Sequence, residues 1–141
     1  MPRKFIIDTD TASDDAIAIL MALRWPDVEV EAITVVSGNV PVEQGTRNAL
    51  YTAQMASRPT PVYSGAPHPL IREIEHADWF HGRDGMGDMN YPAAEHTPEA
   101  KHAVDAIIDT IKANPGITLV TLAPLTNVAL AISRAPEIVA N

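Results

Sequence analysis

The chain has 141 residues, 46% of them hydrophobic and 20% charged, which is enough apolar material for the core of one globular domain. Acidic residues outnumber basic ones by 18 to 10, the net charge is −8, and the sequence has no lysine or arginine cluster that would follow a phosphate backbone. The composition therefore argues against nucleic-acid binding, and the lack of cysteine excludes disulfides, thiolate metal sites and cysteine nucleophiles.

The amino terminus predicts neither a signal peptide nor a membrane anchor. Only residues 5–7 form an apolar run before the first aspartate, and a signal peptide needs a longer core. No apolar run approaches the ~18 residues that span a membrane. We therefore expect a cytoplasmic protein that does not enter a membrane.

The first third of the sequence predicts two strands and the helix between them. Residues 5–7 are an apolar run, typical of a strand buried on both faces. Ser13 suits a helix N-cap, and residues 16–23 are apolar on every side, which predicts a helix buried all round. A second strand is expected over residues 28–36, with a turn at residues 37–39.

The middle of the chain predicts a helix, a short strand and a long loop. A helix over residues 41–57 carries an inward stripe made of Val42, Thr46, Ala49, Leu50, Ala53 and Ala56. Residues 61–63 predict a third strand. Residues 64–96 show no period, and a loop of that length is usually functional or disordered.

The last third predicts a helix, a strand and a further helix. The first helix is expected to start at Thr97 and end before residues 114–116, with an inward stripe of Ala100, Ala103, Val104, Ile107, Ile108 and Ile111. A strand follows over residues 117–122, and the next helix runs to Arg134. Residues 136–141 begin one more helical turn.

Strands that alternate with helices predict an α/β fold. The expected architecture is an open, mostly parallel, Rossmann-like sheet with helices on both faces and ligands at the carboxyl ends of the strands. Because no strand follows the last helix, we expect the chain to be truncated. An unclosed sheet would expose apolar surface and favour association into a homo-oligomer.

Four aspartates gather where the first strand meets its helix: Asp8, Asp10, Asp14 and Asp15. Side chains alternate along a strand and the first helical turn returns over its end, so these carboxylates are expected to converge. Carboxylates this close repel unless a cation or proton lies among them, and oxygen ligands select calcium or magnesium. The alternative is that Asp14 and Asp15 only favour the helix start, while Asp8 and Asp10 lie in a solvated loop.

Four segments of the chain form an ordered set of motifs, namely residues 7–16 (IDTDTASDDA), 36–39 (VSGN), 81–87 (HGRDGMG) and 122–127 (LAPLTN). In these segments the sequence resembles the N-terminal half of the inosine/uridine-preferring nucleoside hydrolases. We therefore expect residues 1–141 to be the N-terminal part of a nucleoside hydrolase-like domain.

The resemblance implies calcium-dependent hydrolysis of ribonucleosides to free base and ribose. The family's calcium ligands would correspond to Asp10, Asp15 and the carbonyl of Thr126. Asp10 would also take a proton from the attacking water, and Asp14 and Asn39 would hold ribose hydroxyls. A carboxylate beside a divalent ion suits this chemistry, since it completes the activation of the water.

Each of these assignments has a simpler alternative. His81 is expected either to contact the nucleobase or to be exposed, Asn39 could be only a turn residue, of a type that tolerates positive φ, and Thr126 only a helix N-cap. Asp8 is expected to orient the loop rather than to bind metal. The remaining histidines lie outside any motif and are expected at the surface; they are His68, His76, His96 and His102.

The sequence departs from the family in two respects. Thr11 and Ala12 stand where many members have Pro-Gly, which the loop accepts only if φ at residue 12 is not positive. In the family a further ligating aspartate and other ribose-binding residues lie in a C-terminal half. The resemblance therefore implies that these 141 residues alone are a poor catalyst.

Two other functions fit parts of the sequence. The Asp8-Thr9-Asp10 pattern also resembles magnesium-dependent phosphotransferases of the haloacid-dehalogenase superfamily, with Asp8 as nucleophile, Asp10 as acid/base and Ser37 on the phosphate. The other alternative is a non-catalytic module that binds metal or ribose without turnover.

Overall fold

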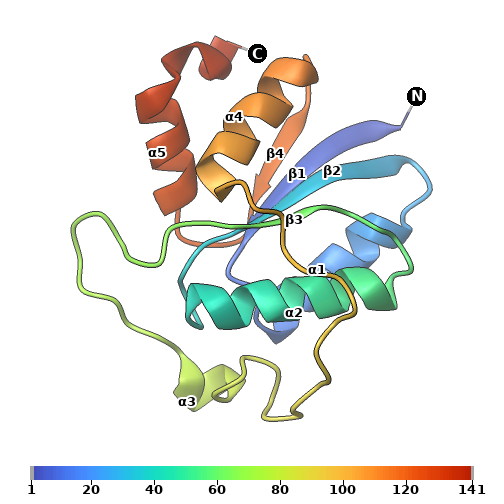
Figure 1. Cartoon of the computed structure of the whole chain (residues 1–141), viewed down its shortest axis with the longest axis vertical. Coiled ribbons are helices and arrows are strands. Elements are labelled where there is room, and N and C mark those ends of the chain that lie inside the picture. Colours follow the sequence, from blue (N-terminus) through green and yellow to red (C-terminus); the bar gives the residue numbers. More distant parts are fainter. Residues whose placement is uncertain (1, 141) are drawn as a thin grey trace.

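The computed structural model describes residues 2–140 and contains one four-stranded sheet, flanked by helices (Figure 1). The strands are β1 (Arg3–Thr9), β2 (Val28–Val35), β3 (Val62–Ser64) and β4 (Thr118–Thr121). All pair in parallel, in the order β3-β2-β1-β4. The predicted open parallel α/β architecture is confirmed.

The strand order places a topological switch beside β1. From β1 the chain adds β2 and then β3 on one side, and it then crosses back to place β4 on the other side of β1. In open α/β sheets such a reversal leaves a crevice outside the carboxyl ends of the two strands that flank it. The carboxyl ends of β1 and β4 are therefore where a ligand site is expected.

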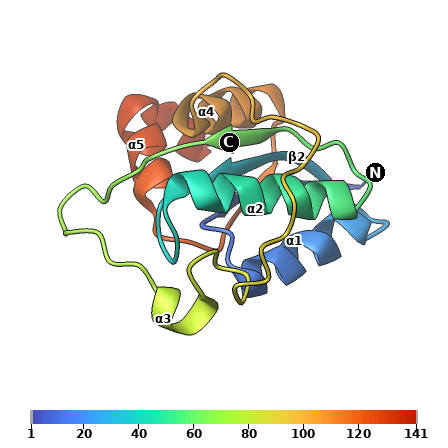
Figure 2. The same ribbon diagram turned by 60° about the horizontal axis from the view of Figure 1, so that its bottom comes forward.

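Helices cover both faces of the sheet, as Figure 2 shows. Helices α1 (Ser13–Arg24) and α2 (Val42–Met55) lie on one face, and α4 (Ala103–Ala113) and α5 (Thr126–Arg134) lie on the other, followed by the 3₁₀ turn η1 (Pro136–Ala140). Consecutive residues of β1 point to opposite layers, as a strand requires. Ile7 packs in the layer of α1 and α2, whereas Ile6 packs in that of α4 and α5.

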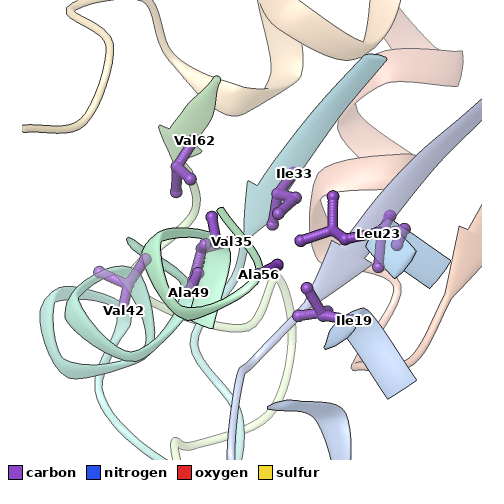
Figure 3. Packing of buried hydrophobic residues seen from close by; sticks show 10 residues of the cluster. Ile19, Leu23, Ile33, Val35, Val42, Ala49, Ala56 and Val62 are labelled. Carbon is purple, nitrogen blue, oxygen red and sulfur yellow. The ribbon is translucent and has the colours of Figure 1, made fainter. Parts of the chain in front are cut away.

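The layer under α1 and α2 shows why these sequences fold as they do (Figure 3). Ile33 and Val35 of β2 meet Ile19 and Leu23 of α1 there. The small side chains of Ala49 and Ala56 let α2 approach the same strand closely. The inward stripe predicted for this helix is confirmed, and a close-packed layer of this kind holds the strand ends rigidly.

Two predictions about α1 are wrong. Ser13 does not cap the helix, because the N-cap position is Ala12, with no side-chain cap, and Ser13 is the first helical residue. The helix is also not buried all round, since Ile17 is 61% and Met21 60% exposed. In the described part of the chain the sheet and α2 cover only one side of it.

The start of α4 also differs from the prediction. The helix begins at Ala103 rather than Thr97, and the ring of His102 accepts a hydrogen bond from the Val104 amide at 3.2 Å as its cap. The preceding segment instead stays beside the sheet, where the Glu99 amide donates to the Val62 carbonyl at 2.8 Å. Tertiary pairing thus overrides a local helix-start signal.

The long loop is only partly irregular, since it contains the one-turn helix α3 (Asp78–His81). Figures 1 and 2 place α3 well away from the sheet, beyond the ends of α1 and α2. Among residues 2–140 no helix is long and apolar enough to cross a membrane.

Candidate active site

The end of β1 carries an unusual run of buried polar residues. Asp8, Thr9 and Thr11 are fully buried, and Asp10 is only 2% exposed. The alternative of a solvated loop for Asp8 and Asp10 is therefore wrong. Because burying a carboxylate is costly unless it is paired, each of these side chains needs a partner.

One oxygen of Asp10 is held and the other is not. Its Oδ2 accepts a hydrogen bond from the Asn39 amide at 2.5 Å. A Cβ built on Gly38 would overlap the Asp10 carboxylate, so only glycine permits this close approach. The buried Oδ1 has no hydrogen-bond partner among the described residues. Asp10 therefore presents a free, oriented carboxylate oxygen.

Asp15 lies beside Asp10, at the start of α1. It is 6% exposed, and its Oδ2 accepts a hydrogen bond from Thr9 Oγ1 at 2.5 Å. Burial raises the pKa of Asp15 to about 7, and the adjacent Asp10 carboxylate also raises it, while the Thr9 hydroxyl opposes the shift. Two buried carboxylates in this arrangement require a proton or a cation between them.

This donor set fits calcium in kind. Carboxylate oxygens are its preferred ligands, and Asp10 Oδ1 is an unpaired one. Within residues 2–140, however, no three His, Asp or Glu side chains form a metal cluster. The two carboxylates that lie together here are Asp10 and Asp15.

Asp8 has a supporting position. Its Oδ1 accepts hydrogen bonds from Thr34 Oγ1 at 2.7 Å and from Asn127 Nδ2 at 2.9 Å, whereas its Oδ2 has no partner in the described chain. Burial raises the pKa of Asp8 to about 6, against the lowering effect of these two hydrogen bonds. Asp8 thus ties β1 to β2 and α5.

Asn127 is a central residue that residue-by-residue sequence reasoning did not single out. Fully buried at the start of α5, it donates to Asp8 Oδ1 and to the Val35 carbonyl, and its Oδ1 accepts from the Ala66 amide at 2.9 Å. One amide side chain therefore joins the ends of β1 and β2 to the segment after β3. The only signal in the sequence is its place in the 122–127 motif.

The other predicted site residues differ in how exposed they are. Thr126 is 8% exposed and is the first residue of α5 rather than its N-cap, so the capping alternative is wrong. Asn39 lies in the bend after β2 without a positive φ, and the turn-residue alternative is not contradicted there. The Asp14 side chain is 72% exposed, which leaves it free to meet a ligand from solvent.

His81, in the long loop, lies against the aspartate segment (residues 8–15). It is 9% exposed, with Nδ1 3.2 Å from Ser13 Oγ and 4.0 Å from Asp14 Oδ1. The alternative of an exposed His81 is therefore wrong. His76 is also not a free surface residue, since its Nδ1 lies 2.8 Å from the Gly38 carbonyl, whereas His68, His96 and His102 are exposed as expected.

The loop that contains Thr11 and Ala12 requires a φ at residue 12 that is not positive, and the backbone meets this condition. Ala12 has a φ of −93°, and the positive φ of 28° falls on Thr11. The strained residue is held from both sides, because its amide donates to Thr9 Oγ1 at 2.9 Å and its carbonyl accepts from Asn48. The loop thus forms without a glycine.

The chain is an α/β protein with an open parallel sheet, and the buried carboxylates Asp10 and Asp15 lie at its switch point. The family profile described as inosine-uridine preferring nucleoside hydrolase matches residues 5–141, and the chain belongs to this family.

Individual relatives agree in sequence and in structure. The chain is 43% identical to an inosine-uridine preferring nucleoside hydrolase of Leishmania major over 99% of its own length and 46% of that protein. It is 42% identical to uridine nucleosidase 1 of Arabidopsis thaliana over 94% of its length and 40% of that protein. It also superposes on a purine-preferring ribonucleoside hydrolase of Gardnerella vaginalis with a TM-score of 0.90 at 38% identity, over 96% of this chain and 45% of that one. The chain thus spans a little under half the length of these relatives.

Proposed function

We propose that this chain carries the metal-binding and ribose-binding part of a calcium-dependent ribonucleoside hydrolase, which cleaves the N-glycosidic bond to free base and ribose. The observation that carries the proposal is the buried pair of Asp10 and Asp15, with Asp10 Oδ1 unpaired at the switch point of the sheet. Relatives named for inosine, uridine and purine substrates support the reaction, while their different preferences leave the base open.

Asp10, Asp15 and the carbonyl of Thr126 are the proposed calcium ligands. A calcium ion held there would supply positive charge that positions a water molecule and makes it more acidic. Asp10 accepts the proton of the attacking water at a carboxylate oxygen, as a general base does. The Asn39 amide holds the other oxygen of Asp10 and so fixes its orientation.

The sugar and the base are proposed to meet the exposed side of the site. Asp14 would accept a hydrogen bond from a ribose hydroxyl, and Asn39 would donate one to a ribose hydroxyl. Asp14 is open to solvent and Asn39 is half-buried, so a ligand can reach both. Charge that develops on the sugar as the bond breaks is stabilised by nearby carboxylates. His81, beside Asp14, is the proposed contact to the nucleobase.

We further propose that these 141 residues alone turn over slowly. Two carboxylates and one carbonyl fall short of the ~6–8 oxygens that calcium takes, so water must complete the shell. A reaction centre that is displaced by about 1 Å can lose ~10²-fold in rate. Association into a homo-oligomer and a cytoplasmic location stay predictions of the sequence.

The phosphatase alternative is not supported by the position of Asp8. That carboxylate would have to attack a phosphate, yet it is fully buried and already hydrogen-bonded to Thr34 and Asn127. A nucleophile needs an open path to the reacting atom. The family match also favours hydrolysis of a nucleoside.

Comparison of two product assays tests the proposed reaction. Purified chain is incubated with inosine or uridine and millimolar calcium, and release of reducing sugar is measured beside release of phosphate from a generic phosphomonoester. We expect sugar release, lost in Asp10→Ala, and no phosphate release. Phosphate release that disappears in Asp8→Asn would instead support the phosphatase.

A further inference from the structure

Asn48 of α2 contacts two segments that lie far apart in the sequence. It is 6% exposed, and its Nδ2 donates to the Thr11 carbonyl at 2.9 Å and to the Asp84 carbonyl at 2.8 Å. Its Oδ1 accepts a hydrogen bond from Gln44 Nε2 at 3.0 Å. Both amide hydrogens and the carbonyl are therefore used, and one side chain links the aspartate segment (residues 8–15) to the HGRDGMG segment (residues 81–87).

Close packing at Gly85 strengthens the same junction. Gly85 has a φ of +72°, and a Cβ added there would lie 2.6 Å from Val40 Cγ1 and 3.2 Å from Asn48 Nδ2. The HGRDGMG segment therefore needs glycine at this position both for its backbone and for its seat on α2. No larger residue fits without displacing the turn.

The HGRDGMG segment is otherwise organised by itself. The Asp84 carboxylate accepts hydrogen bonds from the amides of Met86, Asp88 and Asn90 at 2.8–2.9 Å. Partial burial raises the pKa of Asp84, but these hydrogen bonds together outweigh it, so the pKa is lowered. Local contacts therefore determine the shape of the HGRDGMG segment, whereas a few contacts attach the segment to the rest of the molecule. The hydrogen bond from the buried Asn48 amide is one of these contacts.

The attachment matters because the segment begins with His81. The ring of His81 lies against Ser13 and Asp14, on the same aspartate segment whose Thr11 carbonyl Asn48 holds. Displacement of either segment would therefore change how His81 faces Asp14. Thr11 has an unfavourable φ of 28°, so its carbonyl depends on that hydrogen bond to stay in place.

We propose that Asn48 is a positioning residue: its amide sets the HGRDGMG segment against the aspartate segment and so holds His81 beside Asp14. Asn48 touches neither the proposed calcium ligands nor the exposed side of the site, and it acts through the two backbone carbonyls. The catalytic meaning of this position rests on the proposed function, whereas the coupling of the two segments does not.

Hydrogen exchange of the whole chain tests the coupling. In the wild type the Gly85 amide donates to the Gly82 carbonyl and the Gly87 amide to the His81 carbonyl, so both should be protected. We expect Asn48→Ala and the isosteric Asn48→Asp to speed exchange at residues 82–87 by about 10-fold or more, because the buried Thr11 carbonyl and the partly buried Asp84 carbonyl lose their donor. Exchange in α4 should not change.

Two glycine variants provide a matched pair. Gly85→Ala and Gly116→Ala impose a similar strain, at φ of +72° and +78°, but nothing lies within 4 Å of a Cβ at Gly116. We expect Gly85→Ala to release residues 82–87 as the Asn48 variants do, and Gly116→Ala to leave them protected. The proposal would be overturned if the Asn48 variants exchanged residues 82–87 as slowly as the wild type, or if α4 lost protection equally. If Asn48→Ala does not fold, the result for Gly85→Ala tests the proposal in its place.

Kinetics separates positioning from mere support. With any ribonucleoside that the wild type hydrolyses, we expect Asn48→Ala to raise KM about 10-fold and to lower kcat less, since His81 and Asp14 face the substrate. Unchanged KM and kcat with a released segment would overturn the positioning role. A wild type without turnover contradicts the proposed function alone, because the exchange measurement still decides the coupling.

Discussion

The charged side chains at the two ends of β1 differ in burial and in pairing. At the amino end Lys4 is exposed, forms an ion pair with Glu31 and donates to Asn114 Oδ1 at 2.8 Å. At the carboxyl end Asp8 and Asp10 are buried, and each keeps one oxygen without a partner in the described chain. A single strand therefore carries satisfied charge at one end and unsatisfied charge at the other.

The difference between the two ends distinguishes charges that stabilise the fold slightly from charges that cost stability unless a ligand binds. A surface ion pair typically contributes ~0–1 kcal/mol, because water already solvates both groups. A buried carboxylate without compensation costs several times more. A fold keeps such a group where a ligand compensates it, so the carboxyl end of β1 is where binding should stabilise the protein most.

The largest expected effect is on turnover. Asp10→Ala removes both the proposed base and a proposed calcium ligand, and we expect nucleoside hydrolysis to fall by ~10²–10⁴-fold. Lys4→Met, at the other end of the same strand, is the control and should keep full activity. Steady-state sugar release measures both, and equal losses would remove the functional distinction between the two ends.

Asn127 should give the largest change in stability. Asn127→Ala leaves Asp8 Oδ1, the Val35 carbonyl and the Ala66 amide with fewer partners, and we expect unfolding free energy to fall by ~2–4 kcal/mol. Asn114→Ala, at the amino edge, removes hydrogen bonds to the half-exposed Lys4 and to Thr110, and it should cost under ~1 kcal/mol. Urea unfolding measures both, and a similar cost at the two edges would contradict the comparison.

Stability without calcium should rise as the pH falls from 8 to 5. The folded-state pKa of Asp15 is raised to about 7 and that of Asp8 to about 6, both mainly by burial, so the folded chain binds protons that the unfolded chain does not yet bind. Folding therefore gains free energy as pH drops through these values, and the gain levels off near the unfolded pKa of ~4.

Thermal melts of chelator-treated protein measure this, and we expect a rise of several degrees. Asp15→Asn should flatten the upper part of the profile. A melting temperature that falls steadily from pH 8 to 5 would show that the two carboxyls are not held in the way described.

The smallest effect is expected at the surface pair. Lys4→Met should change unfolding free energy less than the Asn127 variant does, and less still at high salt, because the Lys4 side chain is 42% and the Glu31 side chain 25% exposed, so water still reaches the pair. The pKa of Lys4 is raised, chiefly by its hydrogen bond to Glu31, although the side chain is half-exposed. A large loss of unfolding free energy in urea titrations would show that the charged pair at the amino end contributes as much to stability as the polar contacts at the carboxyl end.

Sequence patterns predicted the fold because a short apolar run lies within β1 and within β2, and α2 and α4 each carry an apolar stripe. They also identified the cluster of four aspartates in residues 8–15, because it is a local pattern, whereas the choice of Asp10 and Asp15 among them came from the family resemblance. The start of α4 was missed because pairing of Glu99 with β3 outweighs a local helix signal. Asn48 and Asn127 were missed because their partners lie 36–37 and 61–119 residues away, which no local pattern encodes.

Calorimetric titration of calcium into chelator-treated protein tests the central claim most directly, namely that the pair of Asp10 and Asp15 is arranged for a cation. We expect the wild type to bind with a dissociation constant of about 10⁻⁴–10⁻³ M, since few protein ligands are present. Asp10→Asn should abolish binding, whereas Asp109→Asn, which changes an exposed carboxylate paired with Lys101, should not. Equal calcium binding by the wild type and Asp10→Asn would contradict the account.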